Sequence, residues 1–242
     1  MIPKIIHYCW FGRNEMPKLA QKCIESWKKH CPDYEIICWN EDNFDINSNR
    51  YVKEAYENKK YAFVSDYVRL YALYNYGGVY MDTDVEVLKP LDEFLNNKAF
   101  SGFENTDWVQ TGIMASEKNL DIMNVLLDYY KERSFITSDG KIDLTSNTKT
   151  ITNILLKKGL VLNNEYQVID DFTLYPSEYF CPIDCETKKK TITKNTYTIH
   201  WFSGSWIPLK SKINSTLYGM FKCVFGDKNA KKVLTFVKKK TN

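Results

Sequence analysis

The chain has 242 residues, enough for one large domain or two small ones with a core that needs no disulfide staples. Its net charge of +3 is too small to indicate a nucleic acid partner, and no apolar run approaches the roughly 18 residues of a membrane span. The N-terminal residues lack the features of a secretory signal. Seven cysteines form no CxxC pair, which favours reduced thiols in a cytoplasmic protein and argues against structural zinc.

The first elements predict a parallel α/β sheet. Residues 3–12 form a short apolar run that ends at a glycine, as a buried strand does. Residues 16–34 repeat apolar side chains at helical spacing, and a proline marks the end of this helix. Residues 34–40 are a second apolar run. A strand, a helix and a strand at this spacing are typical of parallel pairing.

The middle of the chain continues the pattern. Residues 65–78 predict a helix, with Ser65 as its cap, Asp66 in its first turn and Gly77 at its end. We expect one strand over 78–88. The remaining segments predict strands at 98–104 and 109–116, helices at 119–133 and 146–160, and short β segments at 167–176 and 197–206. No repeat or linker interrupts residues 1–206, so we expect one mixed α/β domain there.

The last residues, 207–242, differ in composition. Nine lysines from Lys210 onward face a single acid, Asp227, and apolar residues alternate with them. This pattern predicts a basic amphipathic helical tail. Peripheral contact with an anionic membrane surface and packing of the helix on the domain are equally compatible with it.

Two carboxylates, Asp82 and Asp84, directly follow the apolar stretch "YGGVYM". Residues two apart in a strand point to the same side, so both carboxylates can converge on one point. Two like charges this close are costly unless a cation lies between them, and a hard divalent ion takes oxygen ligands. Ligands of open α/β sheets bind at the carboxyl ends of strands. The pair therefore predicts a metal site.

Several kinds of site contain such a pair. An aspartyl-phosphate enzyme needs Thr or Val at the fifth position, where Glu86 stands. An EF-hand loop needs Gly at the sixth position, where Val87 stands. A nucleotide-sugar site, in which a metal bridges carboxylates and a diphosphate, meets neither objection. The tripeptide alone also fits a plain surface turn.

The wider stretch "SDYVRLYALYNYGGVYMDTDV" resembles the DXD region of the family 32 glycosyltransferases and of the related large clostridial toxin glucosyltransferases. The matching residues are Ser65, Asp66, Arg69, Leu73, Gly77, Gly78, Tyr80, Asp82 and Asp84. "IPKIIHYCWFG" is similar to the opening strand of the family, and "IHWFSGSW" to its closing segment. The resemblance covers residues 1–115 and 197–206.

This resemblance implies a GT-A fold, a Rossmann-like mixed sheet flanked by helices. It also implies metal-dependent hexosyl transfer from a nucleotide-diphosphate sugar, with retention of anomeric configuration. Trp10 followed by Phe11 favours a uridine nucleotide, so we expect a UDP-sugar donor and Mn²⁺ or Mg²⁺ as cofactor. A retaining front-face reaction needs no protein base, because the leaving phosphate takes the acceptor proton.

Catalytic and metal-binding roles follow from the same resemblance. Asp84 would bind the metal directly, and Asp82 would hold the ribose or reach the metal through water. His200 would be a further ligand or, alternatively, a buried core histidine. Arg69 would contact the donor sugar or phosphate, and Gln110 would face the transferred sugar and the acceptor.

The resemblance also implies the donor contacts. Trp10 would stack on uracil with Cys9 and Phe11 beside it, unless it is a core side chain. Asp66 would bind sugar hydroxyls, although it could instead form a surface ion pair with Arg69. The remaining expected nucleotide-sugar contacts are Ser65, Arg69, Gly78, Tyr80, Asp82, Thr83, Ser205 and Trp206.

These inferences predict a cytoplasmic transferase of a hexose or N-acetylhexosamine in bacterial surface polysaccharide (capsule) synthesis. Its acceptor would be a glycan or a lipid-linked sugar, and the basic tail would hold it at the inner face of the cell membrane. Two alternatives stay open. One is an effector-like enzyme that glycosylates a host protein, and the other is a non-catalytic protein that binds nucleotide sugars.

Overall fold

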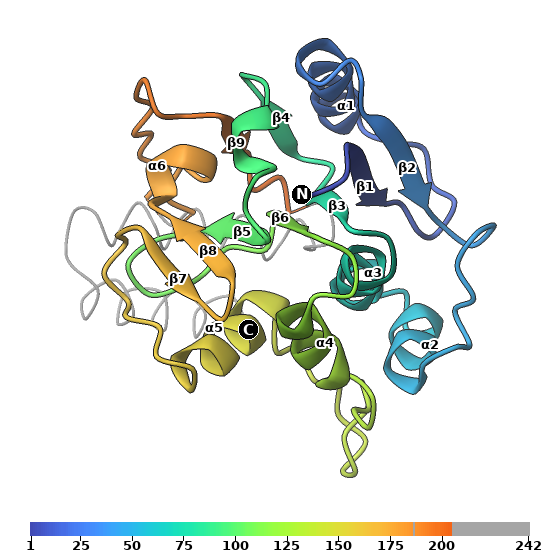
Figure 1. Ribbon diagram of the computed structural model, residues 1–242. Coiled ribbons are helices and arrows are strands. Elements are labelled where there is room, and N and C mark those ends of the chain that lie inside the picture. Colours follow the sequence, from blue (N-terminus) through green and yellow to red (C-terminus); the bar gives the residue numbers. More distant parts are fainter. Residues whose placement is uncertain (186, 205–242) are drawn as a thin grey trace, which may run out of the picture.

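A central seven-stranded sheet organises the computed structural model, which describes residues 1–185 and 187–204 (Figure 1). The strand order is β2-β1-β3-β6-β5-β8-β7, and β4 and β9 form a separate two-stranded sheet. The strands are β1 Ile5–Cys9, β2 Glu35–Trp39, β3 Gly78–Met81, β4 Val85–Val87, β5 Ala99–Gly102, β6 Ile113–Ser116, β7 Gln167–Ile169, β8 Phe172–Tyr175 and β9 Thr198–His200. Because β1 pairs parallel with β2 and β3 while β6 pairs antiparallel with β3 and β5, the sheet is mixed, as expected.

Helices cover both faces of this sheet. They are α1 Lys18–His30, α2 Arg50–Glu57, α3 Tyr61–Tyr76, α4 Asp121–Asp128, α5 Asn147–Leu156 and α6 Ser177–Phe180, with a 3₁₀ turn at Asp92–Phe94. In Figure 1, α1 and α6 lie towards β4 and β9, and α2 to α5 gather on the opposite side. A hydrophobic cluster lies on each side of the sheet. The expected α/β fold with a mixed sheet flanked by helices is confirmed.

The helix before the two aspartates begins earlier than expected. α3 starts at Tyr61, so Ser65 lies one turn inside it and does not cap it. The Ser65 hydroxyl donates to the carbonyl oxygen of Tyr61 at 3.1 Å. Phe63 and Val64 are buried in the core, and this packing extends the helix beyond its predicted start. Asp66 is therefore a buried residue of the helix interior, not an acid of its first turn.

The strand expected over 78–88 is two strands in different sheets. β3 ends at Met81 and β4 begins at Val85, so Asp82, Thr83 and Asp84 form the connection, which we call the DXD turn. The backbone N–H of Val85 donates to the carbonyl oxygen of Asp82 at 3.0 Å and closes the turn. The chain changes sheet because β4 pairs with β9, more than 100 residues away in sequence, which no local pattern predicts.

One helix was not expected from the sequence, and several residues with expected roles are not described by the structure. The sequence did not predict α2, whose N-cap Asn49 accepts a hydrogen bond from the backbone N–H of Val52. Ser205, Trp206 and the predicted helical tail at 207–242 lie outside the described residues. In the part of the chain that the structure describes, no helix has the length and apolar character needed to cross a membrane.

Candidate functional site

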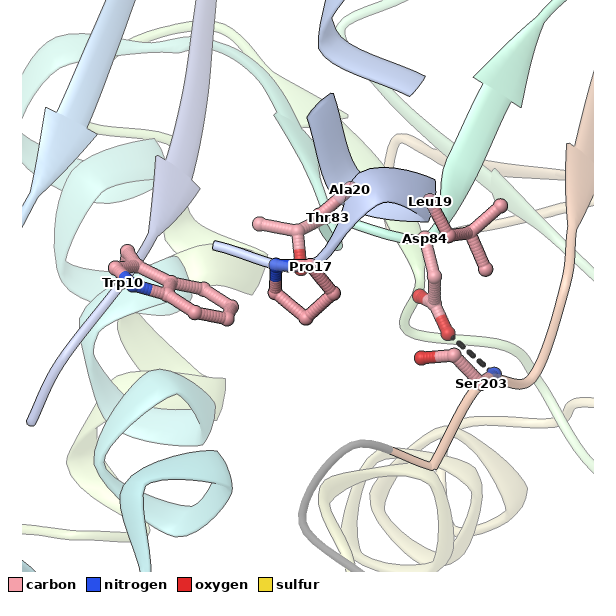
Figure 2. Close-up of a pocket in the computed structure, with 7 residues that line it drawn as sticks. All are labelled: Trp10, Pro17, Leu19, Ala20, Thr83, Asp84 and Ser203. Atoms are coloured by element: carbon pink, nitrogen blue, oxygen red, sulfur yellow. Dashed lines mark hydrogen bonds between the residues drawn. The ribbon is translucent and has the colours of Figure 1, made fainter. Parts of the chain in front are cut away.

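The DXD turn lies at the carboxyl end of β3, next to the carboxyl end of the parallel strand β1. Trp10 follows β1, so the topology brings it to the same edge of the sheet as the two aspartates. A cavity of about 160 Å³ opens there, and its lining residues are Trp10, Pro17, Leu19, Ala20, Thr83, Asp84 and Ser203. Figure 2 shows Trp10 and Asp84 on opposite sides of this pocket, with Pro17 between them. This is the position at which open α/β sheets bind ligands.

Asp84 is held by the last residue of β9 and by the segment that follows this strand. The backbone N–H of Ser203 donates to Asp84 Oδ2 at 2.7 Å, and His200 Nε2 lies 3.3 Å from Asp84 Oδ1 (Figure 2 draws the first bond). Burial alone would raise the pKa of Asp84, but the charge of His200 and the hydrogen bonds from His200 and Ser203 together outweigh it and hold this pKa well below its usual value. Burial alone would lower the pKa of His200, and the Asp84 carboxylate instead raises that pKa well above normal. The two side chains therefore form a strong ion pair when no metal separates them.

Asp82 is held from the other side of the turn. Its Oδ1 accepts a hydrogen bond from the Tyr80 hydroxyl at 2.9 Å and lies 3.2 Å from Arg69 Nη2. Its backbone N–H donates to the carbonyl oxygen of Gly112 at 2.8 Å. The Asp82 side chain is 27% exposed and the Asp84 side chain 14%. Both carboxylates are thus oriented before any ligand binds.

Arg69 is buried in α3, and each of its three nitrogens contacts a protein acceptor. Nε donates to the carbonyl oxygen of Ser65 at 3.3 Å, Nη1 to that of Thr111 at 2.5 Å, and Nη2 to Asp66 Oδ1 at 3.1 Å. Burial raises the pKa of Asp66 to about 6, against the opposing effect of Arg69. Because both side chains are at least 88% buried, Asp66 and Arg69 do not form the surface ion pair considered as an alternative. Arg69 orients Asp82 from behind the turn.

Asp82, Asp84 and His200 together could hold a metal ion. Each offers one ligand atom, and these atoms lie within 4.8 Å of one another. Two carboxylate oxygens and an imidazole nitrogen are ligands that Mn²⁺ accepts, and the carboxylates suit Mg²⁺. Within residues 1–185 and 187–204, no other group of three such side chains converges this closely. The residues present therefore fit a divalent ion.

Of the expected nucleotide contacts, two line the pocket and two neighbours of Trp10 in sequence are buried in the core. Trp10 and Thr83 line the pocket. The Trp10 indole N–H donates to the carbonyl oxygen of Asn14 at 2.7 Å, which holds the ring within its own loop. Cys9 and Phe11 are buried in the core, and burial raises the pKa of the Cys9 thiol to about 12. Trp10 is therefore the residue of this segment that presents its side chain to the pocket.

Three further expected residues are buried and are not among those that line the pocket. Tyr80 is buried and contributes its hydroxyl to Asp82. Gly78 has a φ of +102°, and a Cβ there would lie 2.6 Å from the carbonyl oxygen of Ile5, so β1 and β3 can pair only around a glycine. Gln110 is fully buried, and neither atom of its amide has a hydrogen-bond partner among the described residues.

Two residues that support the site were not predicted. Thr111 accepts the hydrogen bond from Arg69 Nη1. Asn147, the first residue of α5, donates its backbone N–H to Asp66 Oδ2 at 3.3 Å and its side-chain amide to the Asp66 carbonyl oxygen at 3.0 Å. These partners are 42 and 81 residues from the groups they hold, so no local pattern could have indicated them.

The chain is similar to known glycosyltransferases in sequence and in structure. Residues 17–101 match the family model described as a glycosyltransferase sugar-binding region containing a DXD motif. Inositol phosphoceramide mannosyltransferase 3 of Schizosaccharomyces pombe is 33% identical over 125 residues, which are 48% of this chain and 34% of that protein. An uncharacterized glycosyltransferase of Acanthamoeba polyphaga mimivirus is 27% identical over 221 residues, 86% of this chain and 85% of that protein. Among solved structures, the PaToxG glycosyltransferase has a TM-score of 0.47 at 19% identity, over 65% of this chain and 70% of that one.

The chain thus spans about a third of the length of the fungal relative and most of the viral one. The matched segment contains Asp82 and Asp84, the two residues at the centre of the candidate site. Residues 17–101 of this chain therefore match the sugar-binding region of glycosyltransferases that contain a DXD motif.

Proposed function

We propose that this glycosyltransferase moves a hexose or N-acetylhexosamine from a UDP-sugar to a glycan or lipid-linked acceptor, with retention of configuration. The observation that carries the proposal is a single pocket with an aromatic ring, Trp10, on one side and a ligand of the candidate metal site, Asp84, on the other. A nucleoside diphosphate has the matching order of groups, a flat base at one end and a diphosphate at the other.

The residues of the pocket have distinct tasks in this proposal. Trp10 binds the base by stacking, a contact worth about 1–3 kcal/mol per base. A divalent ion bound by Asp82, Asp84 and His200 would neutralise charge on the departing diphosphate. Arg69 keeps Asp82 turned towards the donor, and the Ser203 N–H keeps Asp84 in place. Rate enhancement then comes chiefly from positioning and electrostatics.

The lining of the pocket is compatible with a reaction that needs no protein nucleophile. Asp84 is its one carboxylate among the described residues, and it is engaged by His200 and Ser203. This arrangement supports retention through a front-face displacement, in which the leaving phosphate accepts the proton of the acceptor hydroxyl.

The proposal names the acceptor only by its chemical class. The fungal relative is named for inositol phosphoceramide, a lipid, which supports a lipid-linked acceptor for this chain. The lysine-rich composition of residues 207–242 supports the same class, because cationic segments favour anionic membrane surfaces. Surface polysaccharide synthesis is the role that we assign to such a transfer in a bacterial cell.

Release of nucleotide from donors without acceptor tests the proposal. The purified protein would be given UDP-glucose, UDP-galactose, their N-acetyl forms or GDP-mannose, each with Mn²⁺ or with EDTA. Metal-dependent release from one UDP-sugar is the expected result. Release from GDP-mannose alone would overturn the uridine assignment. Binding of UDP and Mn²⁺ without release from any donor would instead support a non-catalytic binding protein.

A further inference from the structure

The imidazole ring of His200 occupies the space in which a side chain at position 112 would lie. A Cβ built on Gly112 would be 2.7 Å from His200 Nδ1 and 2.9 Å from Cε1, closer than non-bonded atoms approach. Gly112 is not among the residues with positive φ, so its backbone conformation does not require a glycine. The reason for a glycine at this position is therefore space for the His200 ring.

The ring has defined neighbours on its other sides. Phe202 stacks on His200, with ring centroids 4.1 Å apart and an angle of 26° between the planes. The Cys181 thiol lies beside the imidazole in the buried interior. His200 Nε2 faces Asp84. The ring thus lies in a slot that leaves Nε2, the nitrogen on the metal side, directed at the DXD turn.

Gly112 also contacts the opposite end of that turn. Its carbonyl oxygen accepts the backbone N–H of Asp82 at 2.8 Å. Gly112 therefore contacts both sides of the candidate metal site. Its carbonyl oxygen binds the backbone of Asp82, and its lack of a side chain leaves room for the His200 ring. A shift of His200 away from position 112 would change the separation of the three ligand atoms, which now lie within 4.8 Å of one another.

We propose that Gly112 is a positioning residue of the metal site, which sets the place of His200 relative to Asp82 and Asp84. The inference rests on the proposed metal-dependent function. Groups that orient metal ligands typically change metal affinity by about 10- to 100-fold when they are altered. Gly112→Ala should act through His200, because the added methyl group and the ring cannot occupy the same space.

The test is a cycle of four proteins, namely the unaltered chain, Gly112→Ala, His200→Ala and the double variant. Mn²⁺ affinity would be measured without donor by the electron paramagnetic resonance signal of free Mn²⁺. We expect Gly112→Ala to weaken Mn²⁺ binding by about tenfold or more. In the His200→Ala background, where the ring is absent, the same substitution should have almost no further effect.

Thermal unfolding of the metal-free proteins gives a second readout. The double variant should unfold at a higher temperature than Gly112→Ala alone, since the vacated ring space accepts the methyl group. If Gly112→Ala does not fold, rescue of folding by His200→Ala would support the proposal, and failure of both proteins to fold would overturn it.

Other outcomes would also overturn it. Unchanged Mn²⁺ affinity in Gly112→Ala is one, and an equal loss of affinity in both backgrounds is another, because the effect would then bypass His200. A wild-type chain that does not bind Mn²⁺ also contradicts the inference. Wild-type Mn²⁺ binding without nucleotide release would refute the proposed transferase activity alone, so the two failures can be told apart.

Discussion

The two aspartates of the DXD turn belong to different parts of the molecule, although one residue separates them. Asp82 follows β3 of the seven-stranded sheet and is held by Tyr80 and by Arg69 of α3. Asp84 leads into the two-stranded sheet and is held by His200 and Ser203, which follow it by 116 and 119 residues. Asp82 is thus supported by residues close to it in sequence and by the central core. Asp84 is supported by β9 and the residues after it, which are distant in sequence.

This difference predicts different consequences of substitution. On the Asp82 side, Arg69 and Asp66 are buried and bonded to protein groups, so changes there should affect folding first. On the Asp84 side, the side chains line a pocket, so changes there should affect ligand binding and turnover first.

The largest expected effect is that of Asp84→Asn. Loss of this carboxylate removes a metal ligand, and metal-dependent nucleotide release should fall by at least about 10³-fold, towards the rate seen with EDTA. Circular dichroism should show that the domain still folds. Asp128→Asn, at the exposed end of α4, is the control and should be fully active. Full activity in Asp84→Asn would contradict the assignment of the Asp84 side to metal binding.

Arg69→Met should show the reverse behaviour. Removal of the guanidinium leaves the Asp66 carboxylate buried without its ion pair, and breaking such a pair costs about 3 kcal/mol. Urea denaturation would measure the loss in free energy of unfolding. Arg50→Met removes an exposed partner of Glu54 and should cost less than about 1 kcal/mol. Equal losses in the two variants would show that Arg69 does not support the fold in this way.

Trp10→Ala tests the side of the pocket that lies opposite Asp84. Loss of stacking on the base should raise the donor KM by about 10- to 100-fold, with little change in the unfolding temperature, because this ring is only partly buried. Trp10→Phe keeps an aromatic face and should show a smaller increase. Steady-state kinetics over a range of donor concentrations would measure both. A KM in Trp10→Ala equal to that of the unaltered chain would remove Trp10 from the donor site.

Asp66 should give an effect of a different kind, a dependence of stability on pH. Burial raises its pKa from the ordinary value of 3.8 to about 6, so the folded state binds a proton that the unfolded state has released. The free energy of unfolding should therefore fall as pH rises from about 4 to about 6, by up to about 1.4 kcal/mol per pH unit. Asp66→Asn cannot titrate and should lack this slope.

His7 needs to be separated from this effect. Burial lowers the pKa of His7 to about 4, so its contribution to the free energy of unfolding rises with pH between about 4 and 6.5 and opposes that of Asp66. The difference between Asp66→Asn and the unaltered chain, measured by urea denaturation at each pH, cancels the contribution of His7. Parallel stability curves for the two proteins would mean that Asp66 does not titrate in this range.

Much of this protein could be read from its sequence, because the relevant signals are local. The apolar runs of β1 and β2, the helical spacing of α1, and the glycine after α3 each lie within one short segment. The DXD residues and Trp10 could be assigned to one site because the carboxyl ends of parallel strands meet at one edge of a sheet. The stretch around Asp82 and Asp84 was specific enough to indicate the glycosyltransferase sugar-binding region that residues 17–101 match.

Only the tertiary structure decided how these residues are held. Ser65 has the chemistry of a helix cap, but core packing of Phe63 and Val64 starts α3 earlier. An uninterrupted apolar pattern suggested one strand, but pairing with β9 divides it at the aspartates. The contacts of His200 with Asp84 and with Gly112 join segments far apart in the chain. Local sequence patterns indicate which segments prefer a helix or a strand and which side chains are buried. Contacts between distant segments depend on how the whole chain folds, and no local pattern contains that information.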